Sequence, residues 1–137
     1  MGTDYILVFQ KKDIYYYVNF LKQLSPYVNL NYFWKDYLSD NTEKWIELPK
    51  MIDKWQELRN IIEKVVIKKM NDIKNVIAYC PTNYNELQDI YDEYFDGELE
   101  DYMGEFIILG KIDMIIDILD DITWHIEDEK VKLEISY

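Results

Sequence analysis

A long run of apolar residues at helical spacing most strongly limits what this chain can fold into. The run begins after Pro49, a residue that favours the first turn of a helix, and continues to Ala78. A straight helix of this length would extend about 44 Å at about 1.5 Å per residue, so we expect a bend or a break near Lys68 to Asn71. The apolar members recur every three or four residues, as one buried helix face requires: Met51, Ile52, Trp55, Leu58, Ile62, Val65, Val66, Ile73 and Ile77.

Shorter elements are predicted before this helix. Asp4 to Gln10 is rich in β-branched and aromatic residues, which predicts a strand. Asp13 is expected to cap a helix that Ser25 and Pro26 end, because the apolar residues between them recur at helical spacing. The aromatic segment Tyr27 to Leu38 predicts a short helix, although a strand also fits it.

Two further helices are predicted after the long one. Asn83 and Glu86 are three residues apart and resemble a capping box, which opens a helix that Gly97 ends. Apolar residues from Leu99 to Asp121 also recur at helical spacing, although the segment 105–109 fits a strand as well.

The last two segments, 123–127 and 130–137, alternate in polarity as the strands of a hairpin do. The predicted fold is therefore α+β: mostly helical, with a small antiparallel sheet from the N-terminal strand and this C-terminal hairpin. A chain of 137 residues is typical of one compact domain, so we expect residues 1–137 to form a single domain.

Charge is divided unevenly along the chain. Residues 1–80 hold 12 basic and 10 acidic side chains, a net charge of +2, whereas residues 81–137 hold 3 basic and 17 acidic side chains, a net charge of −14. The total of −12 argues against direct binding of nucleic acid or of an anionic membrane, because like charges repel.

Acidic side chains concentrate between Lys74 and Lys111, where the sequence has no basic residue. Spacings of three and four residues put many of them on one helix face, where their repulsion would be relieved by a partner that carries lysine and arginine. Asp113, Asp117 and Asp120 repeat this spacing on the next predicted helix. The predicted partner-binding residues are Glu86, Asp89, Asp92, Glu93, Asp96, Glu98, Glu100 and Asp101.

These acidic residues are interpreted as the binding surface of a small, non-enzymatic inhibitor of a basic protein. The expected partner is a nuclease or another nucleic-acid-binding protein, because such proteins concentrate lysine and arginine at their binding sites. An immunity protein against a nuclease toxin and a viral protein that blocks a host defence both fit. Strict mimicry of nucleic acid is a narrower form, since one helical stripe places a carboxylate every ~5 Å against ~3.4 Å per phosphate on one DNA strand.

Two other interpretations of the composition stay open. The acidic residues can serve solubility alone, with the tyrosines packed in the core. Alternatively, the chain is a structural protein that self-assembles into a homo-oligomer, such as a homodimer, through the aromatic interface Tyr27 to Leu38.

Residues for catalysis, cofactors or metals are sparse. His125 is the only histidine and Cys80 the only cysteine, which excludes the common zinc sites within one chain and leaves no local nucleophile–base pair. A calcium loop around Gly97 would place Tyr94 and Met103 where oxygen ligands are required. We expect no enzyme, no catalytic residue, no cofactor and no metal site. Weak divalent-ion binding and an unspecific carboxylate pair stay open.

The expected location is the cytosol of a bacterium or a host cell. A single cysteine cannot form an internal disulfide, and the first residues lack the basic and apolar stretches of a signal peptide. No uncharged apolar run approaches the roughly 18 residues needed to span a bilayer, so no membrane association is expected.

Overall fold

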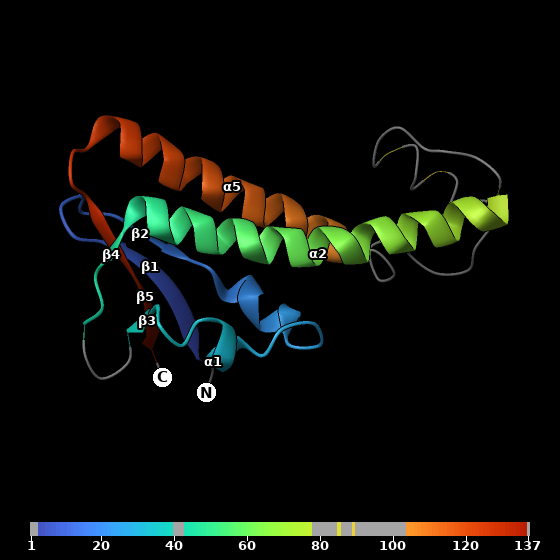
Figure 1. The fold of residues 1–137 in the computed structure, drawn as a ribbon, viewed down its shortest axis with the longest axis horizontal. Coiled ribbons are helices and arrows are strands. Elements are labelled where there is room, and N and C mark those ends of the chain that lie inside the picture. The colour runs from blue at the N-terminus through green and yellow to red at the C-terminus, as the bar shows by residue number, and fades with distance from the viewer. Residues whose placement is uncertain (1–2, 40–42, 78–84, 86–88, 90–103, 137) are drawn as a thin grey trace. The chain divides into compact units, whose positions relative to one another are not determined.

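The computed structural model describes residues 3–39, 43–77, 85, 89 and 104–136 (Figure 1). The fold is α+β, as the sequence predicts. The chain forms two compact units, residues 1–57 with 114–137 and residues 58–113. The elements in chain order are β1 (Asp4–Phe9), β2 (Tyr15–Tyr17), the 3-10 helix η1 (Asn19–Leu24), α1 (Leu30–Phe33), β3 (Leu38–Ser39), β4 (Ile46–Glu47), α2 (Leu48–Ile77), α5 (Gly104–His125) and β5 (Lys130–Ser136).

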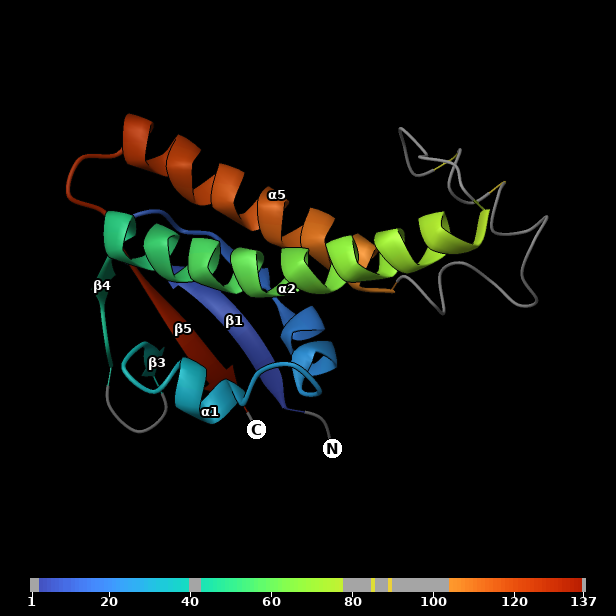
Figure 2. The ribbon, with the colours of Figure 1, turned by 45° about the vertical axis from the view of Figure 1, so that its right-hand side comes forward.

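The first unit contains a mixed sheet of five short strands. β1 pairs antiparallel with β2 on one side and with β5 on the other, and Figure 2 shows β1 and β5 side by side. β4 runs antiparallel to β5, whereas β3 runs parallel to it. The prediction of a purely antiparallel sheet was therefore wrong at β3, which reaches β5 from a distant part of the chain.

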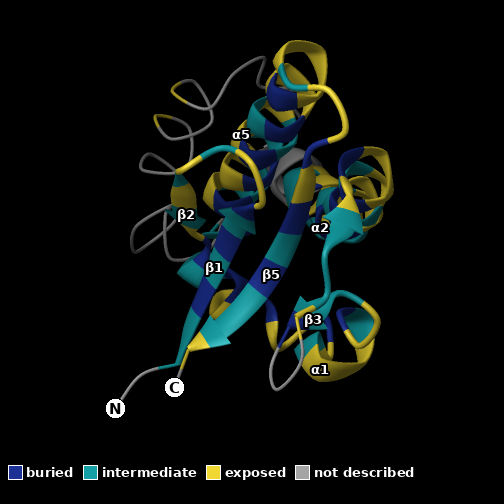
Figure 3. Cartoon of the chain, turned by 90° about the vertical axis from the view of Figure 1, so that its left-hand side faces the viewer, coloured by how far each residue is buried: buried dark blue, intermediate teal, exposed yellow. Residues whose placement is uncertain are grey.

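Every second side chain along β1 and β5 points to the same face of the sheet, and this face lies in the core of the first unit. Buried and half-buried residues alternate along β1 and β5, and no described helix lies in front of these strands in the view of Figure 3. The buried face packs against apolar residues from the start of α2 and the end of α5. The main buried residues of this core are Tyr5, Leu7, Phe9, Val131 and Leu133 from the sheet, and Leu48, Met51, Trp55, Ile115, Leu119 and Ile122 from the two helices.

The second unit joins parts of two helices through apolar and ionic contacts. Leu58, Ile62 and Val66 of α2 are buried, as are Ile108 and Ile112 of α5. The helix predicted from the apolar stripe is confirmed, and it continues without interruption through Ile77, so it has no break near Lys68 to Asn71. After Pro49 in the first turn, residues 50–77 contain no proline or glycine that would break the helical hydrogen bonding.

The predicted C-terminal hairpin was also wrong, because its first half is the end of α5. Apolar residues continue the helical period to Ile122, and the hydroxyl of Thr123 donates to the carbonyl oxygen of Leu119 at 2.9 Å. Asp128 then turns the chain with a φ of 56°, and β5 pairs with β1 instead of with a hairpin partner. The segment 105–109, which also fitted a strand, lies in α5.

The helix predicted after Asp13 was only partly correct. Tyr15 to Tyr17 form β2, because the N–H of Val18 donates to the carbonyl oxygen of Tyr5 and holds this segment against β1. The 3-10 helix η1 follows. The helix predicted from Asn83 lies outside the described residues, and none of the described helices has the length and apolar character needed to cross a bilayer.

Candidate functional site

The structure describes only one of the eight predicted partner-binding residues. Asp89 has helical backbone and an exposed side chain. The other seven lie outside the described residues: Glu86, Asp92, Glu93, Asp96, Glu98, Glu100 and Asp101. Their role stays a prediction.

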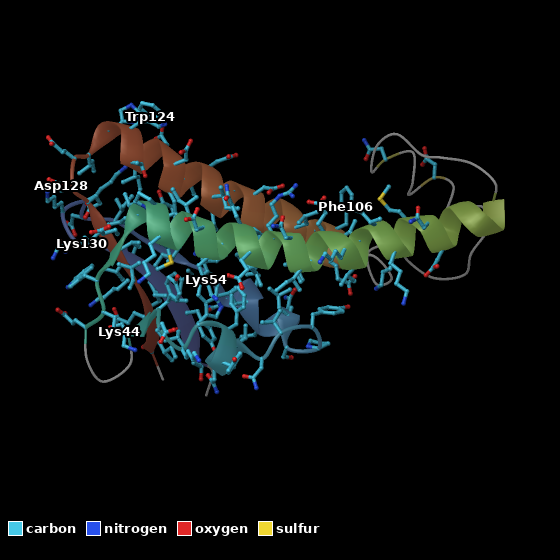
Figure 4. All side chains as sticks on the ribbon, viewed as in Figure 1. Lys44, Lys54, Phe106, Trp124, Asp128 and Lys130 are labelled. Atoms are coloured by element: carbon cyan, nitrogen blue, oxygen red, sulfur yellow. The ribbon has the colours of Figure 1, made fainter. Side chains whose placement is uncertain are left out.

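A second acidic surface is described on the outer face of α5, and we call Asp117, Asp120, Asp121 and Trp124 the α5 acidic face. Spacings of three and four residues place these four side chains on one side of the helix, opposite the buried residues of the same helix. All three aspartates are exposed. Trp124 is 81% exposed and points outward from α5 in Figure 4.

The carboxylates of the α5 acidic face repel one another, which destabilises the isolated chain. Seven acidic residues and no lysine or arginine lie between Lys111 and Lys130. The C-terminal end of a helix already carries partial negative charge, so carboxylates near it repel the helix dipole as well as one another. Among the described residues, Asp117 and Asp120 have no hydrogen-bond or ion-pair partner, and Asp121 lies 3.5 Å from the Nδ1 atom of the exposed His125.

Other acidic residues of α5 are neutralised within the second unit. Asp113 accepts a hydrogen bond from Arg59, which also pairs with Glu63, and the bond to Asp113 raises the pKa of the Arg59 guanidinium. Glu105 is buried and lies 2.9 Å from the Nζ atom of Lys69. The stripe predicted from Asp113, Asp117 and Asp120 is therefore divided, because the carboxylate of Asp113 is already paired with Arg59.

A hollow of about 370 Å³ lies beside the end of α5 in the same unit as the α5 acidic face. Its exposed carboxylates are those of Glu47, Glu127 and Asp128. The carboxylate of Glu129 is buried and accepts main-chain N–H groups, so it serves the fold. The full lining is Glu47, Leu48, Pro49, Thr123, Ile126, Glu127, Asp128, Glu129 and Lys130. A hollow of this size and charge can hold one lysine or arginine side chain of a partner.

Trp124 and this hollow were missed by reasoning from the sequence. The segment 123–127 was assigned to a strand, which separated Trp124 from the aspartates before it. A helix that continues to His125 places Trp124 on the same face as Asp120 and Asp121, because Trp124 follows them by four and three residues.

In the aromatic segment Tyr27 to Leu38, Val28 and Trp34 are buried in the core, whereas the other side chains are half-buried or exposed. Trp34 is fully buried against Trp55, with ring centroids 5.2 Å apart. The ring of Phe33 is covered by the Nζ atom of Lys54 at 4.0 Å from its centroid. Tyr32, at 70% exposure, is the most exposed aromatic residue of the segment.

Relief of charge repulsion should make Asp117→Lys more stable than the natural chain. Lysine at this position would exchange two repulsive contacts, with Asp120 and Asp121, for attractive ones. We expect the free energy of unfolding to rise by about 0.5–1 kcal/mol in low salt, measured by urea denaturation. Asp117→Asn should give roughly half of this gain. Lower stability of Asp117→Lys would contradict the repulsion inferred here.

The described residues contain no group of three histidine, cysteine or acidic side chains arranged to hold a metal ion. No known family model, curated protein or solved structure matches the chain, so the geometry of its own residues carries the functional interpretation.

Proposed function

We propose that this chain is a non-enzymatic, cytoplasmic binding protein that docks through acidic residues on a basic, nucleic-acid-binding surface of a partner protein and inhibits it. The observation that carries the proposal is the α5 acidic face, where a tryptophan with 81% exposure stands among three exposed aspartates.

Solubility accounts for the aspartates but not for Trp124. A large exposed indole lowers solubility, whereas tryptophan is enriched at the centres of protein interfaces. An arginine of the partner can stack on the indole while its guanidinium pairs with a neighbouring carboxylate. Lysine or arginine near the end of α5 would also relieve the repulsion described above.

The proposed partner is a nuclease or another nucleic-acid-binding protein, since these present dense lysine and arginine. An immunity protein and a viral inhibitor of a host defence are the two biological settings that fit. The eight acidic residues predicted from the sequence belong to the same proposal. The alternative, self-assembly through Tyr27 to Leu38, is less favoured because Trp34 is buried in the core.

A capture experiment tests the proposal. The tagged chain is used to retain proteins from a lysate at low salt, beside the variant Asp117→Asn/Asp121→Asn/Trp124→Ala. We expect the variant to retain at least ten times less of the partner, since each lost charge pair or aromatic contact costs on the order of 0.5–2 kcal/mol. Duplex DNA should displace the partner, and retention should weaken at 300 mM salt, about twice physiological ionic strength.

The control variant is Asp36→Asn/Asp53→Asn/Tyr32→Ala. It removes the same charge and one exposed aromatic ring at positions that are exposed and lie outside the α5 acidic face. The control should retain the partner as the natural chain does. Equal retention by both variants would reject the α5 acidic face, and a partner that DNA cannot displace would reject a nucleic-acid-binding surface as the target.

A further inference from the structure

The outer edge of β2 is a free strand edge in the part of the chain that the structure describes. β2 lies at the end of the strand order β2-β1-β5-β3, so only its inner side is paired. Tyr15 and Tyr17 are 61% and 57% exposed, and their rings lie 5.6 Å apart in an edge-to-face contact.

The pairing register fixes which main-chain groups point outward. Tyr16 lies opposite Leu7 and Tyr17 opposite Ile6. The N–H of Val18 donates to the carbonyl oxygen of Tyr5 at 2.8 Å, which identifies their pair as hydrogen-bonded. Hydrogen-bonded and non-hydrogen-bonded pairs alternate in an antiparallel ladder, so Tyr16 bonds to β1 whereas Tyr15 and Tyr17 direct their N–H and C=O groups outward.

We propose that β2 pairs antiparallel with β2 of a second copy of this chain, about a two-fold axis at Tyr16. In this register Tyr15 lies opposite the partner's Tyr17, and Tyr17 opposite the partner's Tyr15. Both are outward-facing residues, so each pair exchanges two main-chain hydrogen bonds. A two-fold axis normal to the sheet keeps all these tyrosines on one face, where cross-strand aromatic pairs are favourable.

Charge at this edge does not oppose a second copy despite the total charge of −12. Residues 14–21 contain no charged side chain, and residues 1–80 have a net charge of +2. The acidic residues near the two ends of β2 are Asp13, two residues before it, and Asp4, which accepts a hydrogen bond from Asn19 at 3.0 Å. The edge lacks proline, an inward-pointing charge and a bulge, which are three of the protections against pairing between copies, although β2 itself is short.

The interface is small, so the dimer is expected to be weak. A three-residue strand buries less than the roughly 800 Å² per partner of stable complexes, and we expect a dissociation constant on the order of 100 μM. Sedimentation velocity from about 10 μM to 1 mM should therefore show a reversible shift from monomer to dimer. Over the same range, amide exchange at Tyr15 and Tyr17 should slow, while Tyr16 stays unchanged because it already bonds to β1.

A charge exchange tests the register itself. Tyr15→Lys/Tyr17→Lys places like charges opposite each other and should weaken the dimer at least ten times, whereas Tyr15→Lys/Tyr17→Glu places opposite charges together and should stay within about three times of the natural affinity. Tyr32→Lys, an exposed tyrosine elsewhere, should change nothing. Equal effects of the two double variants would overturn the proposal. So would a monomer with unchanged amide exchange up to 1 mM, roughly ten times the expected dissociation constant, which would instead leave this edge to an extended segment of another protein.

Discussion

Replacing Trp34 by alanine is expected to lower the free energy of unfolding by about 3–5 kcal/mol. Trp34 is fully buried, and its ring centroid lies 5.0 Å from that of Phe33 and 5.2 Å from that of Trp55. Its removal would leave a cavity at the centre of the first unit that the rigid neighbouring rings cannot fill. Urea denaturation followed by circular dichroism measures the loss.

Tyr32→Ala is the matched control for this prediction. Tyr32 lies two residues away in the same aromatic segment but is 70% exposed, so its removal should cost less than about 0.5 kcal/mol. Trp34→Phe should cost less than Trp34→Ala, because a phenyl ring leaves a smaller cavity. Neither variant loses a hydrogen bond of the buried indole N–H, which has no partner among the described residues. Similar losses for Trp34→Ala and Tyr32→Ala would contradict the core position and favour self-assembly through this segment.

Elements with a local signal were predictable from the sequence. The apolar stripe of α2 and the β-branched run of β1 depend on residues that are neighbours in the chain, and both predictions are confirmed. The sheet partners were not predictable in this way. The pairing of β3 with β5 joins Leu38 to Leu133, and no local pattern specifies a parallel contact between such distant residues.

The candidate site shows the same division between local and distant effects. The acidic surplus was evident in the sequence, but its neutralisation was not, because Arg59 reaches Asp113 across 54 positions and Lys69 reaches Glu105 across 36. Which carboxylates are neutralised depends on which faces of α2 and α5 pack against each other. Among the described residues, Asp117 and Asp120 have no such partner and Asp121 has only the exposed His125, so these three aspartates remain the candidates for binding.

Replacing Glu129 by glutamine is expected to lower the free energy of unfolding by about 2–3 kcal/mol. The Glu129 carboxylate is buried and accepts the main-chain N–H groups of Lys11, Lys12 and Lys130, each at 2.8 Å for its shortest contact. These bonds hold the turn after β1 against the start of β5. Glutamine offers one acceptor oxygen, and its amide N–H₂ would face a main-chain donor. Urea denaturation measures the loss, with Glu127→Gln as the exposed control that should change stability by less than about 0.5 kcal/mol.

Glu129 and Asp117 should therefore respond in opposite ways, although both are carboxylates near the end of the chain. Glu129→Gln should lose stability and keep its affinity for the partner per folded molecule, because its carboxylate is already used by main-chain donors. Asp117→Lys should gain stability and lose affinity, because its carboxylate has no partner in the described part of the chain. If Asp117→Lys bound the partner as well as the natural chain while Glu129→Gln did not, the acidic residues of α5 would be a solvated surface and the binding site would lie elsewhere.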